Sequence, residues 1–255
     1  MATALITGGT SGIGEEFARQ LAARGDDLVL VARDADRLAE AAAALKDRYG
    51  IAVETVTADL ADRSDTLRVA ERLTDADQPI DILINNAGFG VSEKLTSENT
   101  APHDHAIDVM IRAVLVLAGA AGRAMRARGT GVIINVSSTA SFISMGHYSA
   151  IKAWVTTFSE SLSNELNGSG VQVTALCPGY VRTDFHRRAS IRTGAIPSPM
   201  WLDLDEMVRD GLADVDRGRV VSIPSRRYKT LIFFIRLFPR RTVRAVSMRM
   251  SSSRH

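Results

Sequence analysis

The chain has 255 residues, of which 45% are hydrophobic and 24% are charged, a balance typical of one large α/β domain with a substantial core. Its one cysteine, Cys177, excludes an internal disulfide and fits a reducing compartment, so we expect a cytoplasmic protein. We expect neither a signal peptide nor a membrane span, because the N-terminus goes directly into a predicted strand and no apolar run approaches the required length.

The basic residues are unevenly distributed along the chain. Residues 217–255 contain 11 Arg and Lys and no Asp or Glu, whereas residues 1–216 contain the other 20 basic residues and all 29 acidic ones. The net charge of +2 therefore hides a basic C-terminal segment that requires its own explanation.

Short apolar strands alternate with helical patterns along most of the chain. The predicted strands cover residues 2–7, 28–32, 51–57, 80–84, 132–136, 171–176 and 219–223. One predicted helix runs from the glycines after the first strand to residues 24–25, and the others cover residues 34–49, 62–77, 104–128, 148–166 and 204–215. This alternation predicts an α/β fold with a doubly wound parallel sheet of about seven strands and helices on both faces. We expect residues 1–225 to form a single domain, with residues 226–255 as a basic, apolar helical extension of it.

Glycines and polar residues follow the predicted strands. Gly8, Gly12 and Gly14 separate the first strand from a helix, which is the context that a dinucleotide loop needs, although an ordinary strand-to-helix turn is an equal alternative. Arg33 and Asp59 follow the next two strands, and Asn86 follows the fourth. Ligands of doubly wound sheets bind outside the carboxyl ends of the strands, so these signals indicate one site.

Tyr148 and Lys152 lie four residues apart at the start of a predicted helix, and they therefore point the same way. A fixed ammonium one turn away favours the phenolate form of a tyrosine and lowers its pKa toward neutrality. Taken alone, the pair is weak evidence, because a half-buried aromatic beside a surface lysine has the same spacing.

Six motifs with these features occur in one order: Thr7-Gly8-x-x-x-Gly12-x-Gly14, Asp59-Leu60, Asn85-Asn86-Ala87-Gly88, Ser138, Tyr148-x-x-x-Lys152, and Pro178-Gly179 followed by Thr183. Because these motifs occur in this order, the chain resembles the short-chain dehydrogenase/reductases of the single-domain, NAD(P)-dependent type. The resemblance covers about residues 2–225. The resemblance implies a Rossmann-type fold and an NAD(P)-dependent oxidoreductase.

The resemblance also implies a role for each matching position. Ser138 is expected to hydrogen-bond the substrate carbonyl, Tyr148 to act as general acid or base, and Lys152 to bind the nicotinamide ribose and lower the pKa of Tyr148. An alkoxide left by hydride transfer needs such a donor near neutral pH. The expected cofactor-binding residues include Tyr148 and Lys152. At the pyrophosphate they are Gly8, Thr10, Ser11, Gly12, Ile13 and Gly14, and on the adenosine side they are Arg33, Asp59, Leu60, Asn86, Ala87 and Gly88. At the nicotinamide they are Val181 and Thr183, and Pro178 and Gly179 complete the set.

Two positions depart from the family pattern. Ser138 lies ten residues before Tyr148 instead of about thirteen, which a shortened loop explains, with Ser141 a less favoured substitute. Met110 aligns with an Asn that the family associates with a water linking the lysine to solvent. A thioether accepts hydrogen bonds only weakly, so the proton relay is expected to be rerouted or slow.

The cofactor choice depends on Arg33 and Asp34. An acidic residue binds the ribose 2′-OH of NAD, whereas an Arg accommodates the 2′-phosphate of NADP. Asp34 is also expected to cap the following helix, so we predict NADP, with NAD as the alternative.

The loops after the fourth, fifth and sixth strands are expected to form the substrate walls, and they are mostly apolar. This favours a steroid-like, lipid or long-chain acyl substrate. The residues are Phe89, Val91, Phe142, Ile143, Met145, Phe185, Ile191, Ile196, Met200 and Trp201.

Other partners are predicted with less support from the residues. The basic tail of residues 226–249 could lie on an anionic membrane, cover a neighbouring subunit or pack as an ordinary helix. We expect no metal site, because His103 and His105 do not share a helix face and are better explained as solvated residues, and no nucleic-acid binding, because no motif supports it. The resemblance implies a homodimer or homotetramer formed through the helices at residues 104–128 and 148–166.

The sequence therefore predicts an NADP-dependent oxidoreductase that interconverts a carbonyl and a secondary alcohol on an apolar substrate. The alternative is a cofactor-binding regulatory or scaffold protein of the same fold, with weak catalysis because of Met110.

Overall fold

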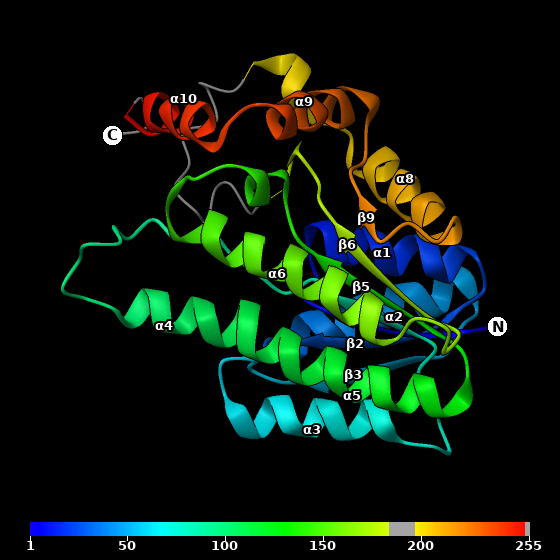
Figure 1. Ribbon diagram of the computed structural model, residues 1–255. Helices are drawn as coiled ribbons and strands as arrows, with labels where there is room; N and C mark the ends of the chain where they lie inside the picture. Colours follow the sequence, from blue (N-terminus) through cyan, green and yellow to red (C-terminus); the bar gives the residue numbers. More distant parts are fainter. Residues whose placement is uncertain (184–196, 253–255) are drawn as a thin grey trace.

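A computed structural model describes residues 1–183 and 197–252, and its centre is one parallel sheet between two layers of helices (Figure 1). The sheet has seven strands in the order β3-β2-β1-β4-β5-β6-β9. Their bounds are β1 Thr3–Thr7, β2 Asp27–Ala32, β3 Val53–Thr57, β4 Ile82–Asn85, β5 Gly131–Val136, β6 Val171–Leu176 and β9 Val221–Ser222. The predicted Rossmann-type fold and strand number are confirmed.

The strand order reverses between β1 and β4. β1 pairs with β2 on one side and with β4 on the other, and successive strands then extend the sheet in both directions. The connections on the two sides of this point leave in opposite directions, which opens a crevice at the carboxyl ends of the strands. The fold therefore provides a binding site at the edge where the polar motifs lie.

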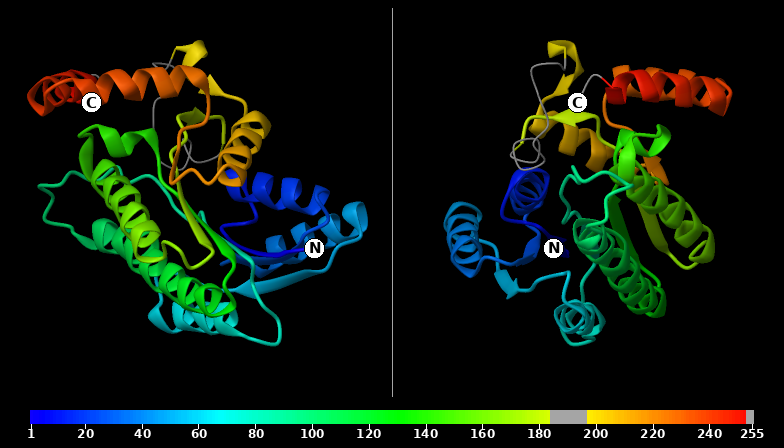
Figure 2. Two further views of the ribbon diagram at one scale, coloured as in Figure 1. Left: turned by 45° about the vertical axis from the view of Figure 1, so that its right-hand side comes forward. Right: turned by 90° about the vertical axis from the view of Figure 1, so that its left-hand side faces the viewer.

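Each face of the sheet is covered by its own helices (Figure 2). The apolar faces of α1, α2 and α8 pack on one side, and those of α3, α5 and α6 pack on the other, so most residues of the central strands are buried. The bounds are α1 Gly12–Ala23, α2 Ala35–Tyr49, α3 Arg63–Thr74, α5 Ala113–Arg128, α6 Gly146–Glu165 and α8 Leu204–Asp216.

The helix predicted for residues 104–128 differs in two ways. It begins earlier, as α4 Ala101–Ile107, because Pro102 is accepted in the first turn of a helix, and it contains a π-helical turn, Asp108–Arg112, before α5. Met110 lies within that turn. A single π-turn adds about one residue to one turn and so shifts the apolar pattern by only one position, which a mostly apolar helix such as this one does not reveal.

The whole helix, Ala101–Arg128, is also long and apolar enough to cross a membrane by length and composition, which our interpretation of the sequence did not anticipate. Its mean hydropathy is 1.6 over the most apolar window, but 56% of that window is buried inside the protein. It packs between α3 and α6 against the sheet, so its apolar composition is explained by burial in the core.

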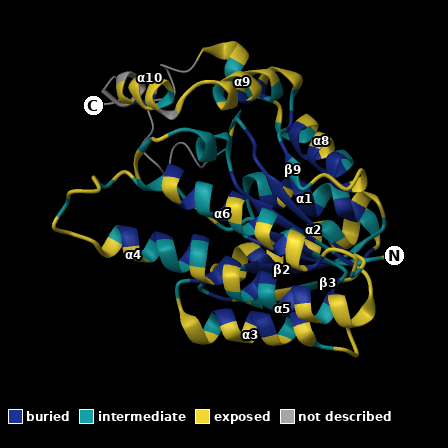
Figure 3. Ribbon diagram, in the orientation of Figure 1, coloured by how far each residue is buried: buried dark blue, intermediate teal, exposed yellow. Residues whose placement is uncertain are grey.

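Two helices, α9 Arg226–Leu237 and α10 Arg240–Ser252, follow the last strand and lie across the carboxyl ends of the sheet (Figure 1). Many of their residues are exposed (Figure 3). The Tyr228 ring anchors α9, because it lies so close to Gly179 that a Cβ atom there would be 2.1 Å from the ring. Its hydroxyl donates to the Met200 carbonyl at 2.7 Å and accepts from the Tyr180 amide at 3.1 Å. These contacts join α9 to the short strands β7 Tyr180–Val181 and β8 Trp201–Leu202.

Candidate active site

A cavity of about 1500 Å³ lies at the carboxyl ends of the strands. It extends from the glycine loop after β1, past the start of α6, to the inner side of α9 and α10. All the predicted site residues line it except Gly14, which is buried beneath the loop. Residues from nearly the whole chain are thus brought to one site.

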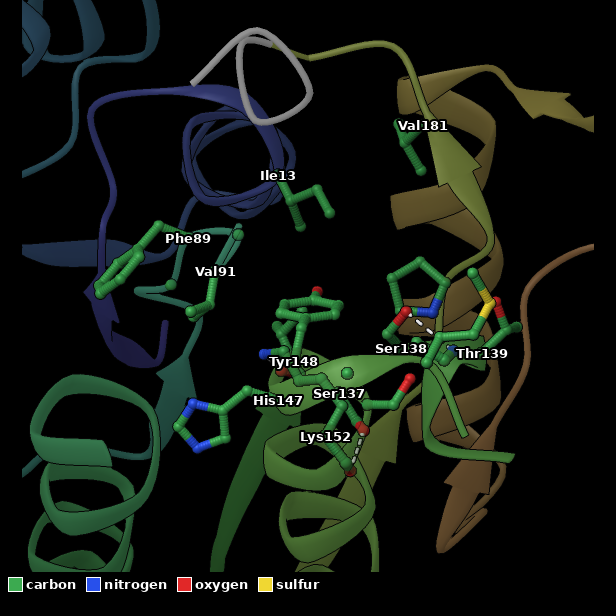
Figure 4. Close-up of a pocket in the computed structure, with 18 of the residues that line it drawn as sticks. Ile13, Phe89, Val91, Ser137, Ser138, Thr139, His147, Tyr148, Lys152 and Val181 are labelled. Carbon is green, nitrogen blue, oxygen red and sulfur yellow. Dashed lines mark hydrogen bonds between the residues drawn. The ribbon is translucent and has the colours of Figure 1, made fainter. Parts of the chain in front are cut away.

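The three predicted catalytic side chains meet where β5 ends and α6 begins (Figure 4). Tyr148 and Lys152 occupy successive turns of α6, and the Lys152 Nζ is 5.6 Å from the centre of the Tyr148 ring. The buried Lys152 ammonium donates to the Val136 carbonyl at 2.8 Å. Because that carbonyl is part of β5, the sheet holds the lysine in place.

Burial controls the protonation of both groups. It raises the pKa of Tyr148 above its usual value, because the phenolate loses hydration, although a hydrogen bond with Ser138 acts in the opposite direction. Burial also lowers the pKa of Lys152 to about 8. Tyr148 is therefore a protonated phenol at neutral pH, and Lys152 titrates close to neutrality.

Ser138 lines this site beside Ser137. It lies in the N-cap position of the 3₁₀ turn Thr139–Phe142, and its Oγ accepts from the Ala140 amide at 3.1 Å. The Ser137 hydroxyl instead donates to the Lys152 carbonyl at 2.8 Å, and Ser141 does not line the cavity. The 3₁₀ turn lies in the connection to α6, within the ten residues that separate Ser138 from Tyr148.

The glycine loop has the shape needed for a dinucleotide phosphate. Gly8 and Gly12 have φ of +68° and +56°, which disfavours any other residue, and a Cβ at Gly14 would lie 2.3 Å from the Gly8 carbonyl oxygen. Asn86 holds the loop, since its side-chain amide donates to the Thr7 carbonyl at 2.9 Å. Its backbone N–H donates to the Thr7 hydroxyl at 2.9 Å. The residues therefore fit a nicotinamide dinucleotide, with Asn86 shaping the loop that would receive it.

Two arginines lie beyond the loop at the end of β2. Asp34 caps α2 as predicted, because its carboxylate accepts from the Arg37 amide at 3.1 Å. Arg33 is exposed and lines the cavity, and so does Arg37, whose guanidinium donates to the Thr10 carbonyl at 3.0 Å. Arg37 was not among the predicted residues, although its position four residues after Arg33 on a predicted helix was a usable signal.

Met110 is fully buried behind the loop that follows β4. Its sulfur packs so closely against Gly88 that a Cβ there would be 3.1 Å from it. Met110 lies in the π-turn, so this buried position makes an apolar contact with the loop after β4.

The predicted apolar walls are only partly correct. Phe89, Val91, Ile143, Met145 and Met200 line the cavity, whereas Phe142 and Trp201 do not. Phe142 lies under the Arg236 guanidinium and Trp201 lies beside Arg182, so both rings pack against cations. Phe185, Ile191 and Ile196 lie outside the described residues.

The C-terminal helices form the remaining wall, which the sequence did not predict. We call α9 and α10 the roof of the cavity. Their cavity-lining residues are Tyr228, Leu231, Ile232, Phe234, Ile235, Phe238, Thr242, Val243 and Ser247, of which the last accepts a 3.3 Å hydrogen bond from the Ser144 amide. The sequence left three alternatives for this segment, an anionic membrane, a neighbouring subunit or an ordinary packed helix, and did not place it at the active site, because its contacts there depend on the path of the chain after β9.

The prediction that His103 is solvated is wrong. It is buried, its Nδ1 lies 2.6 Å from the Nδ1 of His147, and its Nε2 lies 3.1 Å from the Lys94 carbonyl oxygen. His105 stacks on Phe89 and lines the cavity. The histidines thus connect α4 to the start of α6, and the described residues contain no group of three or more His, Cys, Asp or Glu that could hold a metal ion.

The comparisons with known proteins agree with this geometry. The sequence model of the family described as short chain dehydrogenase matches residues 2–193. The chain belongs to the short-chain dehydrogenase family. An uncharacterized oxidoreductase of Staphylococcus saprophyticus is 36% identical over 183 residues, which are 71% of this chain and 78% of that protein.

Two solved structures in the same family resemble this short-chain dehydrogenase. One is a short-chain dehydrogenase from Sphingobium yanoikuyae in complex with NADPH, with a TM-score of 0.84, 38% identity and coverage of 91% of this chain and 92% of that one. The other is the bulky-bulky ketone specific alcohol dehydrogenase from Comamonas testosteroni, with a TM-score of 0.79, 34% identity and coverage of 91% and 90%. The protein is therefore an NAD(P)-dependent oxidoreductase of this family.

Proposed function

We propose that this short-chain dehydrogenase uses NADP to interconvert a carbonyl and a secondary alcohol on an apolar substrate. The observation that supports this most is the position of Ser138, Tyr148 and Lys152 in one cavity with the glycine loop and Arg33. An acid, an orienting hydroxyl and a cation lie together beside a loop shaped for a dinucleotide.

Each catalytic side chain has a role that follows from its contacts. A bound nicotinamide supplies or accepts the hydride. The Ser138 hydroxyl orients the substrate carbonyl, and Tyr148 donates a proton to its oxygen as the alcohol forms. The Lys152 ammonium, held by the Val136 carbonyl, stabilises the phenolate that remains. Because burial raises the pKa of Tyr148, the proton donor that reduction needs is present near neutral pH.

Preference for NADP rests on charge at the end of β2. Arg33 and Arg37 both line the cavity there, while the Asp34 carboxylate is occupied by the N-terminus of α2. The 2′-phosphate of NADP could bind the two guanidinium groups at this site. The ribose 2′-OH of NAD would have no available carboxylate at Asp34 to accept its hydrogen bond. The NADPH in the Sphingobium yanoikuyae structure supports the same choice.

An apolar substrate is supported by the size and lining of the cavity. About 1500 Å³ is more than a small carbonyl compound needs, even with a dinucleotide bound, and the end beyond Tyr148 is lined by aliphatic and aromatic side chains from the roof. The relative named for bulky-bulky ketones supports a large substrate.

A panel of ketones, ordered by size and apolarity, tests these points together. Consumption of NADPH is followed by absorbance, with NADH as the matched alternative and Tyr148→Phe as the inactive control. We expect turnover to increase from short to bulky or long-chain ketones and to require NADPH. Faster turnover of small polar ketones would remove the apolar assignment, and equal rates with NADH would remove the cofactor assignment.

The proposal includes a cytoplasmic dimer or tetramer. The outer side of α5 exposes Leu115, and the stacked pair Trp154 and Phe158 lies on α6, so these two helices offer apolar surface for a second subunit. Cys177 is a buried free thiol, which suits a reducing compartment. Sedimentation velocity measures the assembly, and a monomer at micromolar concentration would contradict it.

A further inference from the structure

Helix α9 has apolar side chains on three sides, and only one of them is needed to hold it in place. Tyr228 and Ile232 are buried beneath it. Leu231, Phe234 and Phe238 line the cavity and are still 40%, 52% and 55% exposed, so they form the rim of an opening. The helix thus closes the cavity only in part.

The third side of α9 points away from the cavity. Phe233 and Leu237, one helical turn apart, are 59% and 64% exposed and do not line the cavity. A single exposed apolar residue is ordinary, but two adjoining ones beside an apolar rim form a continuous patch. We call these five residues, Leu231, Phe233, Phe234, Leu237 and Phe238, the apolar patch.

Exposed arginines precede and follow the apolar patch along the chain, whereas Lys229 of α9 pairs with Asp214. Arg226, Arg241 and Arg244 are exposed on α9 and α10, and none of them forms an ion pair with another described residue. Residues 217–255 contain no Asp or Glu at all. The roof is therefore a strongly basic surface with exposed aromatic side chains at its centre.

We propose that the roof binds the surface of an anionic lipid bilayer, with Phe233 and Leu237 inserted among the acyl chains and the rim residues forming an entrance from the bilayer to the active site. Helices with large apolar side chains and flanking Arg or Lys bind at this depth. Anionic headgroups attract each basic residue near the surface, so charge and apolar area act together.

Charge also distinguishes a bilayer from a second copy of this chain. A twofold contact through the roof would place the same basic segment on both sides, with no acidic residues in that segment to offset the repulsion. A bilayer containing acidic lipids is complementary to both the charge and the apolar patch. The entrance function additionally rests on the proposed apolar substrate, which would be dissolved in that bilayer.

Sedimentation with vesicles tests the binding directly. We expect the wild-type protein to sediment with vesicles of phosphatidylcholine and phosphatidylglycerol at low salt, to be released at high salt, and to remain in the supernatant with phosphatidylcholine alone. The double variant Phe233→Ser/Leu237→Ser should bind the anionic vesicles at least about tenfold more weakly. Leu67→Ser, which changes an exposed leucine on α3, is the matched control and should bind like wild type.

Several results would overturn the proposal. The first is wild-type protein that stays in the supernatant with anionic vesicles, and the second is unchanged binding by the double variant. The third is a smaller assembly for that variant in sedimentation velocity, which would show that the patch contacts another subunit. Ketone reduction gives the second readout. The double variant should reduce a soluble ketone at the wild-type rate, but it should reduce a ketone dissolved in vesicles more slowly than the wild-type protein does. If the protein binds vesicles but turns over no ketone, the lipid-binding surface is supported and the proposed enzymatic function is contradicted.

Discussion

The strand ends and the roof bound the same cavity but are built differently. At the strand ends the functional groups named here are buried or half-buried and held by hydrogen bonds to the sheet, as Lys152 is by the Val136 carbonyl and Asn86 by the Thr7 carbonyl. The roof is apolar and largely exposed, and it is held through Tyr228 and through hydrogen bonds of Arg227, Lys229 and Ser247. Catalysis requires fixed distances between the reacting atoms. Recognition of a large apolar molecule requires apolar contact area and tolerates movement of the side chains that provide it. We therefore expect changes at the strand ends to alter rate, and changes in the roof to alter substrate range.

The largest effect is expected at Tyr148. Tyr148→Phe removes the only proton donor assigned to the substrate oxygen and leaves the ring in place, so kcat should fall by about 10²–10⁴. Binding of NADPH, measured by fluorescence titration, should change little. A variant that retains most of its turnover would show that another group donates the proton.

The pH dependence separates the two directions of the reaction. Oxidation needs the phenolate of Tyr148, and because burial holds the pKa of this phenol above its usual value, kcat/KM for an alcohol should rise with pH, about tenfold per unit above pH 7. The slope should become shallower above about pH 8, where Lys152 loses its proton. Reduction uses the protonated phenol and the Lys152 ammonium, so it should stay level from pH 6 to 7 and fall as Lys152 loses its proton near pH 8. An oxidation rate that levels off below pH 8 would mean that Tyr148 ionises more easily than its burial allows.

A smaller effect is expected at the cofactor end. Arg33→Ala should weaken NADPH binding by about 1–3 kcal/mol, the range for hydrogen bonds to charged groups, and leave NADH binding nearly unchanged. Arg48→Ala, at the far end of α2, is the control for loss of a positive charge and should affect neither cofactor. Equal weakening of both cofactors by Arg33→Ala would remove the 2′-phosphate assignment.

The contact between the roof and the strand ends can be broken at Gly179. Gly179→Ala introduces a Cβ against the Tyr228 ring, which should displace α9 and destabilise the protein by about 1–3 kcal/mol, measured as a lower Tm. Turnover of a bulky ketone should fall more than turnover of a small one. Adding Tyr228→Ala makes room for the new methyl group, so the double variant should be more stable than the sum of the two single changes predicts.

The smallest effect is expected at Met110. Met110→Asn would place a polar group in the π-turn, and if a relay through this position limits proton transfer, kcat should rise by less than the 10²–10⁴ of a whole general acid. Burying an amide without a partner should cost about 1–3 kcal/mol of stability. Met110→Leu is the control, since it keeps the site apolar. An unchanged kcat and pH profile in Met110→Asn would show that the enzyme has an adequate relay of its own.

The sequence by itself determined the fold and the strand-end half of the site. The seven strands follow from short apolar runs alternating with helices, and parallel pairing then places the residue after each strand at one edge. That is why residues as far apart as Gly8, Asp59 and Asn86 were predicted to lie at one edge, and all three line the cavity. Tyr148 was assigned to the same site only through the resemblance to the family. The spacing of Tyr148 and Lys152 and the cap at Asp34 are local features that a helix reproduces anywhere.

Only the tertiary structure decided which of the remaining residues enter the site. The π-turn at Met110, the pairing of His103 with His147 and the Tyr228–Gly179 contact leave no periodic pattern, because each depends on how separate elements pack. The same holds for the roof, whose apolar residues fitted a surface helix, a subunit contact or a membrane face equally well. Its place over the active site follows from the path of the chain after β9, and the closest contact on that path is possible because Gly179 lacks a side chain.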